Sequence, residues 1–169
     1  MDAKTQSDPA SGTNRTMVER RSEREMIAMR TFDAPPHIVF EAWTKPELLK
    51  RWWTPKSLGM SFLSCEIDAR TGGFYRFVFA HPAAEQPMAF FGRYVEVTPH
   101  SLIAWTNDEG GDGGPVTTVT FEQRGAGTLV VVSDLYPTRE ALDDAIASGS
   151  MMDAFDEMFG QLDEILVTL

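Results

Sequence analysis

Residues 150–169 read SMMDAFDEMFGQLDEILVTL, and the apolar side chains of this stretch recur at helical spacing. One wide apolar face carries Met151, Phe155, Met158, Phe159, Leu162, Ile165, Leu166 and Leu169. Ser150 and Asp153 resemble a capping box at its start. The stretch predicts a long C-terminal amphipathic helix that buries one face against another layer.

The layer that this helix packs on is predicted from the middle of the chain. A first strand begins near Glu23, where apolar side chains start to alternate. Six further β patterns cover Met60 to Asp68, Phe74 to Ala80, Met88 to Val97, Ser101 to Thr106, Val116 to Gln123, and Thr128 to Leu135. Their short, turn-rich links favour antiparallel hairpins. The sequence therefore predicts a curved antiparallel sheet of seven strands.

Three short helices are also expected. Proline stands near the first turn of two helix starts, at residues 33–36 and 44–47, so two short helices should follow the first strand. Thr138 can cap a third helix from Arg139 to Ala147. The fold class is therefore α+β, with a sheet that grips the C-terminal helix.

The last two strands show the clearest alternation. Val119 and Phe121 share one face, while Leu129, Val131 and Leu135 share a face of the next strand. That assignment leaves Thr128 and Asp134 among the side chains that can face water.

Length and composition limit the range of functions. The chain has 169 residues with 43% hydrophobic content, which fits a single domain at 22–169 after a disordered tail at 1–21. Its net charge is −10, so neither a nucleic-acid nor a membrane partner is expected. Cys65 is the only cysteine, which excludes an intramolecular disulfide. We expect a cytoplasmic protein without cofactor or metal, in which Cys65 is a small apolar packing residue.

A comparison of sizes raises the question of a cavity. A helix of about 20 residues is roughly 30 Å long and about 10 Å wide, whereas seven strands span close to 30 Å. One helix cannot cover such a sheet. Either the sheet curls and the two short helices close the gap, or an apolar hollow remains.

Several motifs, taken in order, resemble the activator-of-Hsp90-ATPase-homologue-like branch of the START/Bet v 1-like (SRPBCC) superfamily. They are Arg30 to Pro35, Ala42 to Glu47, Arg51 to Pro55, the turn with Asp68, Arg70, Gly72 and Gly73, Tyr75-Arg76, Gly92 to Pro99, and Thr118 to Phe121. The resemblance implies the helix-grip fold, in the order one strand, two helices, six strands and a helix. Thr54 and Ala154-Phe155 depart from the glycine and the Gly-Trp that the family usually has.

The resemblance implies a ligand cavity between sheet and helix. Its expected wall residues are Trp52, Trp53, Tyr75, Phe77, Phe79, Phe91, Trp105, Met151, Phe155 and Met158. Core packing remains the alternative for at least one of Trp52 and Trp53. Arg76 is a possible polar group for a ligand carboxylate, although pairing with a carboxylate on a neighbouring strand is the simpler interpretation.

Three functions stay open. The first is binding of an apolar small molecule in this cavity. The second is an enzyme that uses the same cavity as a cyclase or hydrolase does, with Arg76, Glu96 and His100 as its titratable candidates, although no catalytic arrangement is recognisable. The third is a stress-related or co-chaperone-like protein-interaction module, with self-association as a homodimer also possible.

Overall fold

Eight antiparallel strands form one curved sheet in the computed structural model, which describes residues 15–111, 114–148 and 151–169, the last from 154 onward for side chains. Along the sheet the order is β1-β2-β8-β7-β6-β5-β4-β3. The strands are β1 (Met17–Arg20), β2 (Glu25–Phe32), β3 (Ser61–Ile67), β4 (Phe74–Ala80), β5 (Met88–Thr98), β6 (Leu102–Thr106), β7 (Val116–Arg124) and β8 (Gly127–Leu135).

The eighth strand corrects the predicted count of seven. β1 lies inside the segment that the sequence assigned to a tail, whereas residues 1–14 lie outside the described part of the chain. Its side chains are mostly exposed, so no buried face marked it in the sequence. It pairs with β2 through the backbone from Met17↔Met29 to Arg20↔Met26.

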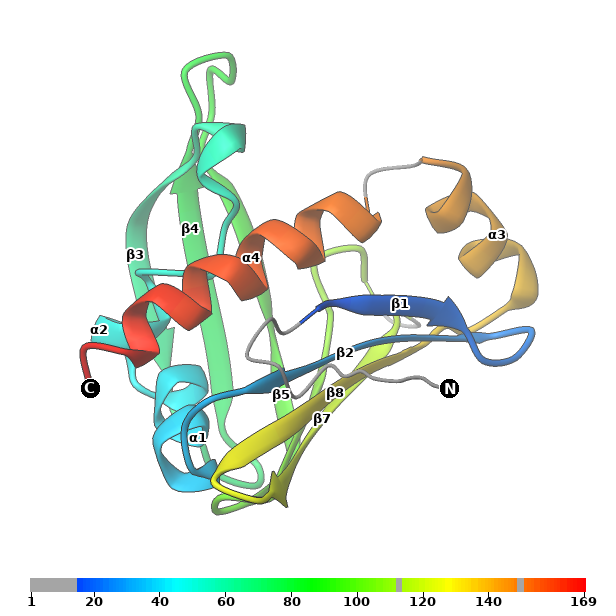
Figure 1. The fold of residues 1–169 in the computed structure, drawn as a ribbon. Helices are drawn as coiled ribbons and strands as arrows, with labels where there is room; N and C mark the ends of the chain where they lie inside the picture. The colour runs from blue at the N-terminus through cyan, green and yellow to red at the C-terminus, as the bar shows by residue number, and fades with distance from the viewer. Residues whose placement is uncertain (1–14, 112–113, 149–150) are drawn as a thin grey trace.

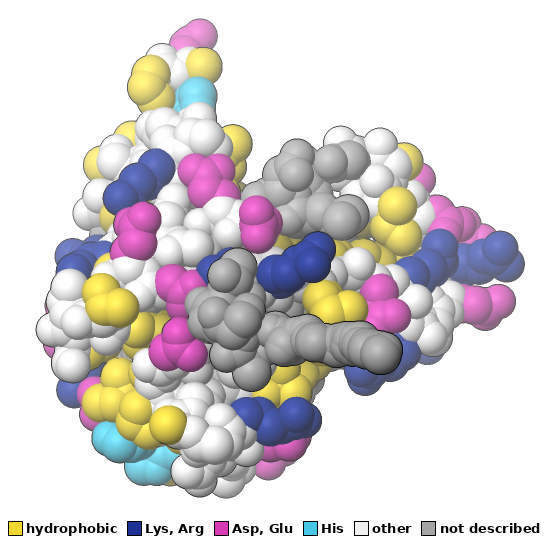
Figure 2. All heavy atoms as spheres, viewed as in Figure 1, with side chains coloured by type: hydrophobic (Ala, Val, Ile, Leu, Met, Phe, Trp, Pro, Cys, Tyr) yellow, Lys and Arg dark blue, Asp and Glu magenta, His cyan; other side chains and the backbone are white. Residues whose placement is uncertain are grey.

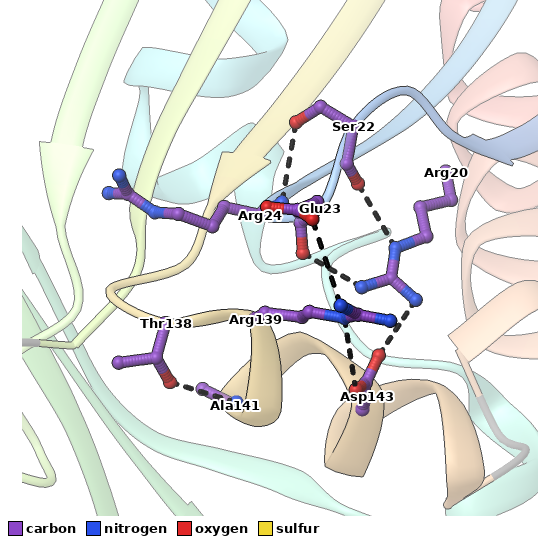
Figure 3. A network of polar contacts seen from close by, with 8 residues as sticks. All are labelled: Arg20, Ser22, Glu23, Arg24, Thr138, Arg139, Ala141 and Asp143. Carbon is purple, nitrogen blue, oxygen red and sulfur yellow. Dashed lines mark hydrogen bonds and ion pairs between the residues drawn. The ribbon is translucent and has the colours of Figure 1, made fainter.

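Polar contacts join the β1–β2 hairpin to α3 (Arg139–Ala147) (Figure 3). The guanidinium of Arg20 lies 2.8 Å from the carboxylate of Asp143, and that of Arg139 lies 3.7 Å from Glu23. The hydroxyl of Thr138 accepts a hydrogen bond from the amide of Ala141 at 3.0 Å, so the predicted cap of this helix is present.

The remaining helices are α1 (Pro36–Thr44), α2 (Pro46–Leu49), the single 3₁₀ turn η3 (Lys56–Leu58) and α4 (Met151–Leu166). Proline occupies the first turn of both α1 and α2, as the sequence predicted. The long C-terminal helix is confirmed, and it ends at Leu166 rather than at Leu169.

α4 crosses the concave face of the sheet, with α1 and α2 near its C-terminal end and α3 beyond its N-terminal end (Figure 1). Phe159 and Leu162 are fully buried, and the ring of Phe159 packs edge-on against Phe32 of β2 at 5.5 Å between centroids. The guanidinium of Arg30, also on β2, forms an ion pair with Asp163 of α4. The outer side of α4 is acidic (Figure 2).

The inward face of β8 differs from the sequence-based assignment. Thr128, Val130 and Val132 are buried, and Asp134 follows on the same face. Asp134 therefore points into the molecule, where the prediction had it facing water. Residues 129–132 are all apolar, so their pattern does not show which face is inside.

None of the described helices combines the length and the apolar character needed to cross a bilayer.

Candidate ligand-binding cavity

A cavity of about 370 Å³ lies between the sheet, α4 and the segment that follows α2. Ten aromatic side chains line it: Trp43, Trp53, Tyr75, Phe77, Phe79, Phe90, Tyr94, Trp105, Phe155 and Phe159. Apolar side chains between the rings include Leu49, Met60, Val132 and Met158. This volume lies within the range of about 300–1,000 Å³ that small-molecule sites occupy.

Strand alternation supplies most of the rings. Tyr75, Phe77 and Phe79 are the buried positions of β4, and their neighbours Phe74 and Arg76 are exposed. β5 and β6 add Phe90, Tyr94 and Trp105, while α4 adds Phe155, Met158 and Phe159 across the cavity. The wall therefore results from one continuous inward face of the sheet opposed by one face of a helix.

The structure brings together most of the predicted wall residues. Trp53, Tyr75, Phe77, Phe79, Trp105, Phe155 and Met158 all line the cavity. Trp52 does not: it is fully buried, and its indole N–H donates to the carbonyl of Ala42 at 3.0 Å, which makes it a packing residue. The side chain of Met151 lies outside the described residues.

Phe91 and Arg76 point away from the cavity. The two residues pair across β4 and β5 on the outer face, where Phe91 is 39% exposed, and Phe90 takes the inward position instead. Because Phe90 and Phe91 are adjacent and of the same type, the sequence does not show which of them faces the cavity. Glu96 and His100, the other titratable candidates, are also exposed.

One glutamine fixes the segment that closes the cavity. Gln161 of α4 is 7% exposed, and its amide group donates to the carbonyls of Trp52 and Thr54 at 3.1 and 2.9 Å. Its oxygen accepts from the amide of Lys56 at 2.8 Å. These three bonds hold Trp53, Thr54 and Pro55 as part of the wall.

At one end the apolar wall gives way to polar side chains, among them Tyr75, Asn107, Thr117 and Asp134. The hydroxyl of Thr117 donates to Oδ1 of Asp134 at 2.6 Å, and Nδ2 of Asn107 donates to Thr117 at 3.0 Å. The same Nδ2 donates to the carbonyl of Pro115 at 2.8 Å, which fixes the orientation of the amide. We call this set the polar relay.

The relay has a defined direction. Because Nδ2 of Asn107 is a donor, the hydroxyl of Thr117 uses its own proton toward Asp134. Burial raises the pKa of the Tyr75 hydroxyl, so this group stays protonated and donates to the carbonyl of Thr106 at 2.9 Å. Asn107 therefore donates to Thr117 and Thr117 to Asp134, whereas the hydroxyl of Tyr75 donates to the backbone of Thr106.

Burial raises the pKa of the Asp134 carboxyl above its ordinary value of 3.8, and the hydrogen bond from Thr117 opposes part of that shift. The nearby titratable groups are Glu109, on the same cavity wall, and Tyr136, whose pKa burial and the charge of Asp134 raise to about 12. The sequence analysis did not identify Asp134 as a cavity residue. The only indication that it faces inward was its period-two spacing from Val130 and Val132.

Replacing Asp134 with asparagine is expected to stabilise the protein at neutral pH. A raised carboxyl pKa means that the folded state binds this proton more tightly, so stability falls as pH rises from the unfolded pKa through the folded one. The Asp134→Asn variant has no carboxyl group to ionise, so it avoids this loss of stability. Its amide oxygen can still accept the hydrogen bond from Thr117. Its melting temperature should exceed that of the wild type by about 2–4 °C at pH 8, and should be nearly equal at pH 4.

Thermal unfolding at the two pH values, with Asp144→Asn on the exposed face of α3 as the control, measures this difference. An Asp134→Asn variant that is less stable than the wild type by the same amount at both pH values would contradict the prediction that burial makes ionisation of Asp134 unfavourable.

Cys65 is half-buried and packs beside the core. Burial raises the pKa of its thiol to about 11, so it stays protonated at neutral pH.

Comparisons with protein families and with solved structures place the chain among known proteins. Residues 33–167 match the model of the family described as Activator of Hsp90 ATPase homolog 1-like protein. The comparison with curated proteins found no match.

Solved structures share the fold. A crystal structure from Rhodobacter sphaeroides is 24% identical with a TM-score of 0.81, and the match covers 91% of this chain and 99% of that one. A protein from Chromobacterium violaceum is 30% identical with a TM-score of 0.69, over 83% of this chain and 96% of that one. The solution structure of an AHSA1-like protein from Aeromonas hydrophila is 19% identical with a TM-score of 0.63, over 83% and 94%.

Proposed function

Since this chain belongs to the Activator of Hsp90 ATPase homolog 1-like family, within the SRPBCC superfamily, we propose that it binds an apolar small molecule in the cavity between its sheet and α4. The cavity of about 370 Å³ with a mainly aromatic wall is the observation that carries this proposal. Apolar surface taken from water and aromatic stacking would supply most of the affinity.

The wall is well suited to hold such a ligand. Its side chains come from the sheet, from α1 and from α4, so a bound molecule would be enclosed by elements that the core already fixes. The rings of Trp53 and Trp105 lie 6.2 Å apart, and Phe77 lies 5.7 Å from Trp53. Met60 and Met158 add flexible side chains that adapt to ligand shape.

Isothermal titration calorimetry with the neutral probe 2-naphthylmethanol tests this function. We expect a dissociation constant on the order of 10–100 μM, as the size of the probe allows. Val132→Trp puts an indole into the cavity and should weaken binding at least about tenfold. Val131→Trp, the neighbouring position on the opposite face of β8, is the matched control and should bind as the wild type does.

Met158→Trp fills the cavity from the side of α4 and provides a second test should Val132→Trp unfold. Equal binding by the wild type and by a folded cavity-filling variant would exclude the cavity as the site, and absence of binding to the wild type would refute the proposed function.

A further inference from the structure

The cavity wall carries two carboxyl groups and no basic group among the described residues. Asp134 and Glu109 both line it, whereas no Lys, Arg or His is among the described lining residues. A ligand carboxylate would therefore meet the carboxyl group of Asp134 inside the cavity and the exposed carboxylate of Glu109 at its edge, and no group of opposite charge. This charge pattern disfavours fatty acids and other anionic ligands.

The carboxyl group of Asp134 has capacity for one more donor. Thr117 donates to Oδ1, and no described residue donates to Oδ2. Asp134 stands directly across from Thr117 in the β7–β8 pairing, so its place in the wall is set by the sheet. A charged donor on a ligand would complete the carboxylate and offset the cost of burying it.

Aromatic side chains lie in the same row of the sheet as this carboxyl group, with Thr117 between Asp134 and the first of them. The pairings Tyr94↔Trp105, Trp105↔Thr117 and Thr117↔Asp134 run straight across four strands, and all four side chains line the cavity. The rings of Tyr75 and Tyr94 lie 6.2 and 6.5 Å from that of Trp105. A cavity that holds a carboxyl group at one strand and indole and phenol rings two and three strands away suits an organic cation, because carboxylates and aromatic faces both attract positive charge.

We infer that the cavity selects apolar molecules that carry a protonated amine, with the ammonium group at Asp134 and the hydrocarbon body among the aromatic rings. This inference rests on the proposed function and names its ligand class. The surroundings agree with it, since the chain has a net charge of −10 and α4 carries Asp156, Glu157, Asp163 and Glu164 without any basic residue. Such a field attracts cations toward the site.

Calorimetric titration at pH 7 with three probes of equal shape tests the selectivity: 2-naphthylmethylamine, 2-naphthylmethanol and 2-naphthoic acid. The amine should bind the wild type about tenfold to a hundredfold more tightly than the alcohol, as a charge-assisted hydrogen bond allows. The acid should bind most weakly. In Asp134→Asn the advantage of the amine should disappear, while affinity for the alcohol stays within about threefold of the wild type.

Asp144→Asn, on the exposed face of α3, is the matched control, because it removes a carboxylate away from the cavity and should leave the amine preference intact. Glu109→Gln tests whether the other carboxyl group of the wall produces the preference instead. Equal affinity of the wild type for amine and alcohol would overturn the inference and leave the proposed function standing. A preference that survives Asp134→Asn and is lost in Glu109→Gln would also overturn it. If none of the three probes binds, the proposed function itself fails.

Discussion

Replacing Gly92 with alanine is expected to lower the free energy of unfolding by about 3 kcal/mol, because the new methyl group has no space. An ideal Cβ at this position would lie 1.9 Å from the carbonyl oxygen of Thr106 and 2.9 Å from the ring of Tyr75. The obstacle at Thr106 is backbone of the neighbouring strand β6, so β5 and β6 would have to separate.

The same variant should disturb the polar end of the cavity. The hydroxyl of Tyr75 donates to the carbonyl of Thr106, and Asn107 of the polar relay is the next residue. A shift of β6 therefore moves the relay together with the ring of Tyr75. We expect Gly92→Ala to weaken binding of the amine probe as well as to destabilise the fold.

Gly160→Ala is the matched control for this prediction. An added Cβ at Gly160 of α4 meets nothing within 4 Å, and alanine has the higher helix propensity, so stability should rise by about 0.5–1 kcal/mol. Urea unfolding of both variants measures the contrast. Similar changes in stability for the two variants would contradict the close approach of β5 and β6 at Gly92.

Gln161→Leu should cost about 3 kcal/mol or more in the free energy of unfolding. The substitution leaves three backbone groups without their partner, namely the carbonyls of Trp52 and Thr54 and the amide of Lys56. The bond to Trp52 is buried and the other two are partly buried, and a buried polar group that loses its partner costs about 1–3 kcal/mol. Leucine is close in size to glutamine, so the loss of stability measures mainly the missing hydrogen bonds.

Hydrogen exchange locates the effect of this substitution. The amide of Lys56 should exchange faster in Gln161→Leu, because its acceptor is gone, whereas Gln161→Glu retains an acceptor and should keep most of the protection. Gln123→Leu changes an exposed glutamine and should alter stability by less than about 0.5 kcal/mol. Unchanged exchange at Lys56 in Gln161→Leu would contradict the role given to this side chain.

The sequence predicted the parts of the fold in which one periodicity dominates. In β4 every second residue is buried and the residues between are exposed or half-buried, and its predicted bounds, Phe74 to Ala80, agree with the structure. The sequence also predicted α3 and its cap Thr138, because a single capping residue precedes a helical pattern. The match of residues 33–167 to the family model confirms the resemblance that the ordered motifs indicated.

Other features depend on strand register, which the sequence leaves open. Residues 129–132 place apolar side chains on both faces of β8. On β5, Phe90 and Phe91 are adjacent and of the same type, so either could face inward. A shift of one residue inverts every side chain of a strand, so Asp134 was assigned to the outside and Phe91 to the cavity. The polar relay could not be predicted, because its members come from separate segments that only the folded sheet brings together.

The central claim is that the ligand lies between the sheet and α4, and intermolecular nuclear Overhauser effects with bound 2-naphthylmethanol test it most directly. The account predicts contacts from the probe to the methyl groups of Val132, Met60 and Met158, which line the cavity. Contacts to the exposed side chains of Leu63 and Val95, without any to those cavity methyl groups, would contradict it.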